Sequence, residues 1–374
     1  MPTSPSRVYS DRPDRPADAD PECAESRRQR GDTAASRRAV RIAGLVALAV
    51  LMVWLGPKLG LRRVVTADHD AVAVIIGAGV TVLLLRGVAL WWLLRTLAPG
   101  VSTWRTLATY PVTTVVSTLA PGGRTGGAPV NGLVLARTTG VEYEDGVAAS
   151  FALSLLTNLA VIAVGGVGVL ALLSHAAAGG VVGPLVRALV VVGTAALLGA
   201  LFVRHSSGQL RQWLATVVVT VGSRLSVIPG VAAPSRARVD QSVSNLVGAL
   251  REYRTRPRTL LLPGGVLVVA HALTIAALWV ALSAFDATVP VPFLMAVVPL
   301  AVVAVVVPTP GGLGGVETSL AALISAGSAT SASVSAVSVV LYRAGTVLPA
   351  LVCGGVVLLA VFSLAELREA DWTR

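Results

Sequence analysis

Two ionisable residues near the end of the chain stand within apolar sequence and are the first candidates for chemistry. Glu317 follows a glycine-rich segment, and Arg343 lies about 14 Å into the next apolar stretch at 1.5 Å per residue. Charged side chains at membrane depth are costly and usually functional. Glu317 is therefore a candidate for proton exchange or head-group contact, and Arg343 for binding a phosphate. The alternatives are a glutamate stabilised by a helix dipole and a structural Glu317–Arg343 ion pair.

Two glycine-rich segments, Pro121–Gly127 and Pro308–Glu317, have a similar order of residues. Proline and glycine break helices, and at membrane depth such a break is tolerated only where it is buried in protein or lines a polar cavity. Arg124 stands among backbone N–H groups that can hold an anion, with a turn arginine facing water as the alternative. The glycines predicted to form substrate-binding backbone are Gly122, Gly123, Gly311 and Gly312.

Three further polar residues fall within apolar stretches. Asn158, in the span after the first glycine-rich segment, is expected to make an interhelical hydrogen bond. Tyr342 adjoins Arg343 and is a candidate for substrate contact, with core packing as its alternative role. Arg86 is expected to extend to the cytoplasmic face of the membrane.

The composition requires a membrane to surround the elements that position these residues. Of 374 residues 54% are hydrophobic and 13% are charged, which indicates an all-α polytopic membrane protein. The formal net charge of +11 comes from arginines beside the apolar runs, and no nucleic-acid motif accompanies them. Anionic lipid head groups are therefore the expected partners, and nucleic acid is not. Cys23 and Cys353 are not expected to form a disulfide, and no cofactor or metal site is predicted.

About six full transmembrane helices are predicted, in a plasma-membrane protein whose two termini are cytoplasmic. Residues 1–38 are expected to form a disordered tail, and residues 39–374 a single membrane domain with a basic cytoplasmic loop at 204–258. The predicted spans are 40–57, 71–94, 146–172, 181–203, 259–284 and 334–363.

This topology makes residues 96–145 enter and leave by the cytoplasmic face, and residues 288–330 by the opposite face. Each stretch is therefore predicted to form a re-entrant helical hairpin. The hairpins belong to two predicted repeat halves, at about 96–203 and 259–363. Broken helices in corresponding places of two inverted halves indicate a transport site near the bilayer midplane. The alternative is eight full spans.

Three groups of residues resemble the lysylphosphatidylglycerol synthase transmembrane-region family, whose members are described as flippase-like. They are Pro310-Gly311-Gly312-Leu313-Gly314 with Glu317, Leu341-Tyr342-Arg343 with Pro349, and Pro121-Gly122-Gly123 to Gly140 followed by Asn158. Many members carry charged residues where this chain has the uncharged 154–158 region, which is closer to an actinobacterial-type branch. The resemblance implies the lipid-flipping half of such proteins, without the fused aminoacyl-transfer domain.

The function that these observations favour is transport of an anionic phospholipid or lipid-linked intermediate between leaflets, by a protein that is not an enzyme. One alternative is a membrane scaffold whose protein partner docks on loop 204–258. Another is an intramembrane polyprenyl-phosphate glycosyltransferase that would use Asp68 and Asp70.

Overall fold

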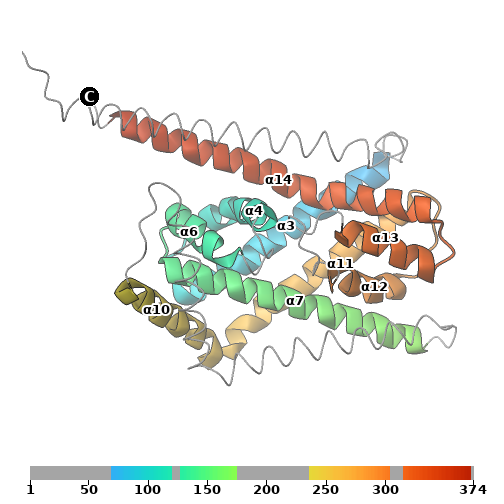
Figure 1. Cartoon of the computed structure of the whole chain (residues 1–374), viewed down its shortest axis with the longest axis horizontal. Helices are drawn as coiled ribbons and strands as arrows, with labels where there is room; N and C mark the ends of the chain where they lie inside the picture. Colours follow the sequence, from blue (N-terminus) through green and yellow to red (C-terminus); the bar gives the residue numbers. More distant parts are fainter. Residues whose placement is uncertain (1–68, 120–126, 175–235, 304–314, 372–374) are drawn as a thin grey trace, which may run out of the picture. The chain divides into compact units, whose positions relative to one another are not determined.

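The computed structural model describes residues 69–119, 127–174, 236–303 and 315–371, and every regular element within these ranges is a helix (Figure 1). These residues belong to one compact unit, Arg62–Arg374. The predicted tail at 1–38, the predicted spans at 40–57 and 181–203, and residues 204–235 of the basic loop lie outside the described residues.

Within the described ranges, four helices are long and apolar enough to cross a membrane. They are α3 (His69–Leu97), α7 (Tyr143–Ser174), α11 (Leu261–Ser283) with the short helix η1 before it (Pro257–Leu260), and α14 (Ala332–Asp371). Large apolar side chains such as Val74, Val80 and Leu84 are exposed on α3, as expected for a helix surrounded by lipid. The predicted spans at 71–94, 146–172, 259–284 and 334–363 therefore coincide with four helices of membrane-spanning length.

Two pairs of shorter helices lie between the long ones. The first pair is α4 (Thr103–Leu119) and α6 (Ala128–Thr139), and the second is α12 (Val291–Val303) and α13 (Gly315–Gly327). The members of each pair pack against each other. Helices of 12 or 13 residues extend only about 18–20 Å, which is less than the hydrocarbon thickness of about 30 Å. Gly140 ends α6 in the left-handed conformation, with φ of 80°.

The helix contacts repeat one pattern in two sets, α3–α4–α6–α7 and α11–α12–α13–α14. Helix α3 packs against α4, α7, α11 and α14, and its counterpart α11 packs against α12, α14, α3 and α7. Helix α6 contacts α4 and α7, as α13 contacts α12 and α14. The sets interlock because α7 packs on α12 and α14 packs on α4 (Figure 1).

Glycines allow close approach at both interlocking crossings. A Cβ atom added to Gly168 of α7 would lie 2.7 Å from the carbonyl oxygen of Pro292 in α12. A Cβ atom added to Gly354 of α14 would lie 2.6 Å from the carbonyl oxygen of Pro111 in α4. Small residues at such crossings let helix backbones pack tightly in a membrane.

The two short helix pairs pack in separate cores at opposite ends of α3. Ile75, near the start of α3, is buried with Leu294 of α12 and Ile324 of α13. Leu93, near its end, is buried with Leu135 of α6. The α12–α13 pair therefore lies near the first turns of α3, and the α4–α6 pair near its last turns.

Helix α10 (Arg236–Thr255) packs on α3 and α7 beside the second of these cores. The buried hydroxyl of Tyr253 donates a hydrogen bond to the Leu93 carbonyl oxygen at 2.9 Å. Burial, with a smaller effect of the Asp145 charge, raises the pKa of Tyr253 well above its usual value. This part of the predicted basic loop is therefore a helix fixed to the membrane domain.

Candidate functional site

The structure brings the two predicted charged residues together. The Nε of Arg343 donates a hydrogen bond to Oε1 of Glu317 at 2.6 Å, and the two side chains are 25% and 16% exposed. Glu317 is the third residue of α13, where the helix dipole favours a carboxylate. Arg343 is the twelfth residue of α14, well inside a candidate membrane span. The pair is therefore a largely buried ion pair between two helices.

Tyr342, which adjoins Arg343 in α14, also interacts with a charged side chain of α3. Tyr342 is buried in the apolar core and interacts electrostatically with Arg343, Glu317 and Arg86 of α3. Arg86 also interacts with the buried His271 of α11. The Nε atom of Arg86 is buried, and the expected extension of this side chain to the cytoplasmic face stays a prediction. Arg86 therefore contributes positive charge in the neighbourhood of Tyr342.

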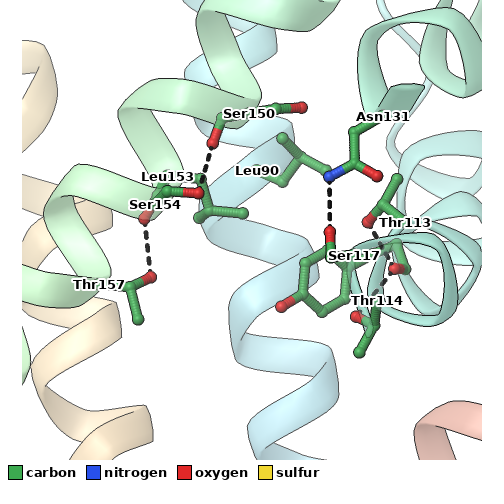
Figure 2. A pocket seen from close by; sticks show the side chains of 10 residues that line it. Leu90, Thr113, Thr114, Ser117, Asn131, Ser150, Leu153, Ser154 and Thr157 are labelled. Carbon is green, nitrogen blue, oxygen red and sulfur yellow. Dashed lines mark hydrogen bonds between the residues drawn. The ribbon is translucent and has the colours of Figure 1, made fainter. Parts of the chain in front are cut away.

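An uncharged polar cavity lies among the helices of the first set (Figure 2). Its volume of about 20 Å³ is enough for about one water-sized group. Most of its lining side chains carry hydroxyl or amide groups, and they come from α3, α4, α6 and α7. They are Leu90, Tyr110, Thr113, Thr114, Ser117, Asn131, Ser150, Leu153, Ser154 and Thr157.

Several polar groups in this cavity are held by neighbours on the helices. The Nδ2 of Asn131 donates to Ser117 Oγ at 2.8 Å and so connects α6 to α4. The hydroxyl of Ser154 donates to the carbonyl oxygen of Ser150 at 3.0 Å, one turn earlier in α7. Asn131 is 7% exposed, and its Oδ1 is buried without a hydrogen-bond partner among the described residues. A buried amide oxygen in this state favours a bound hydrogen-bond donor.

Arg86 and the cavity residue Leu90 are close neighbours along α3. Leu90 lines the cavity, and Arg86, which interacts with Tyr342, precedes it by four residues, or about 6 Å of helix. In the sequence, Ser117 and Asn131 lie on either side of segment 120–126. Glu317 follows segment 304–314. Both polar sites therefore adjoin the ends of the glycine-rich segments that the sequence singled out.

The family model of the lysylphosphatidylglycerol synthase TM region matches residues 41–354. The chain belongs to this family. The match includes both helix sets up to Gly354, and it confirms the resemblance recognised in the sequence. No match to the chain was found among curated proteins.

Several site residues predicted from the sequence are not part of the two polar sites described above. Asn158 is exposed and does not line the cavity, and its predicted interhelical hydrogen bond is absent from the described part of the chain. Five predicted residues lie outside the described residues: Gly122, Gly123, Arg124, Gly311 and Gly312. Sequence reasoning missed Ser117, Asn131 and Ser154. The spacing of 150, 154 and 157, which places three hydroxyls on one helix face, was the available signal.

Proposed function

We propose that this member of the lysylphosphatidylglycerol synthase TM region family moves an anionic lipid between leaflets without catalysing a covalent reaction. The observation that carries the proposal is the largely buried Glu317–Arg343 pair within a domain of membrane-spanning helices. Ionisable groups inside a membrane protein usually mark the pathway of a substrate or an ion. An arginine is suited to a lipid phosphate because it can donate two parallel N–H groups to it.

The short helix pairs provide a path for such a lipid if they are re-entrant hairpins, which is the second part of the proposal. Their lengths support this, because α6, α12 and α13 are each too short to cross the hydrocarbon core. Their positions near opposite ends of α3 support entry from opposite faces of the membrane. The paired contact pattern supports two inverted repeats, and transport sites in such folds lie between the repeats.

Charge on the described surface supports the proposed orientation. Near the end of α3, exposed arginines gather on α3, α4, α6, α10 and η1: Arg95, Arg105, Arg137, Arg251, Arg256 and Arg258. The exposed Asp286 lies after α11, on the side of the other core. Because arginines concentrate on cytoplasmic loops, we place the end of α3, and both chain termini, in the cytoplasm of a plasma-membrane protein.

In the proposed mechanism the lipid phosphate competes with Glu317 for Arg343. Arg86 adds a second positive charge to this group, and Arg124 of the first glycine-rich segment is proposed as a further phosphate ligand. Protonation of Glu317 weakens its ion pair with Arg343, and the free guanidinium then binds the phosphate. Loss of the phosphate restores the ion pair. The pair therefore alternates between a closed state and a lipid-bound state.

Movement of a fluorescent anionic phospholipid in liposomes containing the full chain tests the proposal. Arg343→Ala is expected to slow the movement by about 10- to 150-fold, the equivalent of one charge-assisted hydrogen-bonded contact of about 1.5–3 kcal/mol. Arg256→Ala is the matched control, because this arginine is exposed and its ion pair among the described residues is with the nearby Glu252. An Arg343→Ala variant that moves the lipid at the wild-type rate would refute the role of Arg343. Wild-type protein without lipid movement would refute transport.

A further inference from the structure

Two adjacent tryptophans near the end of α3 contact an exposed arginine. The guanidinium carbon of Arg95 lies 5.3 Å from the centre of the Trp91 ring and 5.9 Å from the centre of the Trp92 ring. The two indoles meet edge to face, with centres 5.7 Å apart and planes at 83°. Residues three and four positions apart share a helix face, so this spacing places the charge beside both rings. The rings therefore restrict the guanidinium although Arg95 is exposed.

The N–H groups of this guanidinium are free to bind a ligand. Within the part of the chain that the structure describes, Arg95 makes no ion pair, whereas the exposed Arg256 is paired with Glu252. A cation–π contact uses the face of the planar guanidinium and leaves the N–H groups at its edge. Two of these groups can donate side by side to the oxygens of a phosphate.

Tryptophans also indicate the level of this arginine in a membrane. Trp104, the second residue of α4, follows Arg95 by nine positions and is 78% exposed. Trp91 and Trp92 are half-buried near the end of a helix long enough to cross a membrane. Tryptophan is enriched at the level of the lipid head groups, where its ring meets apolar and polar surroundings at once. Arg95 is therefore expected at the level of the lipid phosphates, on whichever face of the membrane this end of α3 lies.

Other charges near the end of α3 favour an anion there. Exposed Arg258 belongs to η1, which packs against α3, and exposed Arg105 belongs to the first turn of α4. Carboxylates are present at this end as well: Glu252, which pairs with Arg256, and Glu142, Glu144 and Asp145 at the start of α7. Since Arg95 is paired with none of these carboxylates, its charge is left to attract an external anion.

The exposed face of α3 below Arg95 is apolar, which favours a lipid over a free phosphate ion. Leu84 is 50% exposed and precedes Arg95 by 11 residues, or three turns and about 16 Å of helix. Because 11 residues complete about three full turns, Leu84 and Arg95 lie on the same helix face. An acyl chain can therefore lie along this face while its phosphate reaches Arg95.

We propose that Arg95, restricted by Trp91 and Trp92, binds the phosphate of an anionic membrane lipid whose acyl chains lie along α3. The lipid is a bound partner of the helix surface. The site is separate from the proposed movement of lipid by the Glu317–Arg343 pair, and its test measures binding alone.

Native mass spectrometry of the full-length protein, with phosphatidylglycerol and phosphatidylcholine in competition, measures this binding. The first lipid is an anion, whereas the second carries an ammonium that balances its phosphate. Wild type is expected to bind phosphatidylglycerol preferentially. Arg95→Gln is expected to weaken phosphatidylglycerol binding by about 10- to 30-fold, the equivalent of a charge-assisted contact at an exposed site. Trp92→Leu is expected to weaken it by a smaller factor, because the charge stays but one of the restricting rings is lost.

Arg137→Gln is the matched control for a general effect of surface charge. Arg137 is exposed in the last turn of α6, and it has no ring contact or ion pair within the described ranges. Its loss is expected to change binding by less than about twofold, because an isolated exposed charge is screened by salt. Equal losses for Arg95→Gln and Arg137→Gln, or wild type without a preference for phosphatidylglycerol, would overturn the site.

Glycerol 3-phosphate distinguishes a lipid from a free phosphate, because it carries the phosphate without acyl chains. It is not expected to displace bound phosphatidylglycerol from wild type. Displacement at an equal concentration would overturn the assignment to a membrane lipid. Failure of lipid movement in liposomes, with the binding preference intact, would instead overturn transport and leave this site in place.

Discussion

Neutralising both partners of the Glu317–Arg343 pair is expected to destabilise the protein by less than the sum of the two single neutralisations. Two unit charges about 4 Å apart attract by about 4 kcal/mol at an effective dielectric constant of about 20. Removing one partner of a buried pair also leaves the other charge uncompensated, at a cost of about 3–5 kcal/mol. Because the two side chains are 25% and 16% exposed, solvent reduces this, and we expect about 2–4 kcal/mol for Glu317→Gln or Arg343→Met.

Reversible unfolding in detergent, followed by intrinsic tryptophan fluorescence, measures these changes. The double variant Glu317→Gln/Arg343→Met is expected to lose less stability than the sum of the single losses, with a coupling of about 1–3 kcal/mol. The exposed Arg256–Glu252 pair, at 3.1 Å between residues four apart in the sequence, is the control and is expected to show a coupling of about 0–1 kcal/mol. Additive single losses at Glu317 and Arg343 would refute an energetically important ion pair.

Exchanging the two charges separates the structural role of the pair from its proposed role in transport. The double variant Glu317→Arg/Arg343→Glu keeps an opposite-charge pair but moves the guanidinium to α13. Stability is therefore expected to recover in part, whereas lipid movement is expected to stay low because the phosphate ligand is displaced. Full recovery of lipid movement would contradict the assignment of the phosphate to Arg343.

Two further predictions concern packing and ionisation. Gly79→Ala would place a Cβ against the backbone carbonyl of Gly345, so we expect a loss of about 1–3 kcal/mol in unfolding free energy. The control Gly77→Ala meets nothing within 4 Å and is expected to be neutral or slightly stabilising. Equal effects of the two variants in thermal unfolding would refute close α3–α14 packing. Tyr253→Phe removes the hydrogen bond to Leu93 and is expected to cost about 0.5–1.5 kcal/mol near neutral pH. Because burial raises the folded-state pKa of Tyr253, the unfolded state ionises first and wild-type stability falls as pH rises above about 10. The Phe variant is expected to lose this part of the pH dependence in alkaline unfolding titrations, and an unchanged dependence would contradict burial of the hydroxyl.

The long helices were predictable because an apolar run of about 20 residues has few alternatives to crossing the membrane. The predicted boundaries 71–94 and 146–172 fall within α3 and α7. The short pairs were harder, since α4 and α6 differ in length and composition from a span, and only their common packing shows that they act together. Whether these pairs enter the membrane from opposite faces stays a prediction.

The candidate site was predictable only in part, because charge is conspicuous in an apolar sequence and hydroxyl groups are not. Glu317 and Arg343 stood out individually, and the sequence left open whether they pair. Asn131 and Ser117 did not stand out, since serine, threonine and asparagine occur widely in membrane helices and bond to their own backbone. Their shared cavity exists only where α4, α6 and α7 meet.

The sequence by itself determined that this chain is a helical membrane protein of its family, with two glycine-rich segments and with charged residues inside apolar stretches. These conclusions depend on composition and local order, which folding does not alter. The tertiary structure decided that Glu317 meets Arg343, that the Nε atom of Arg86 is buried, and that Asn158 is not part of the cavity. Each of these contacts joins residues from different helices or depends on which helix face is covered, and packing alone sets those relations.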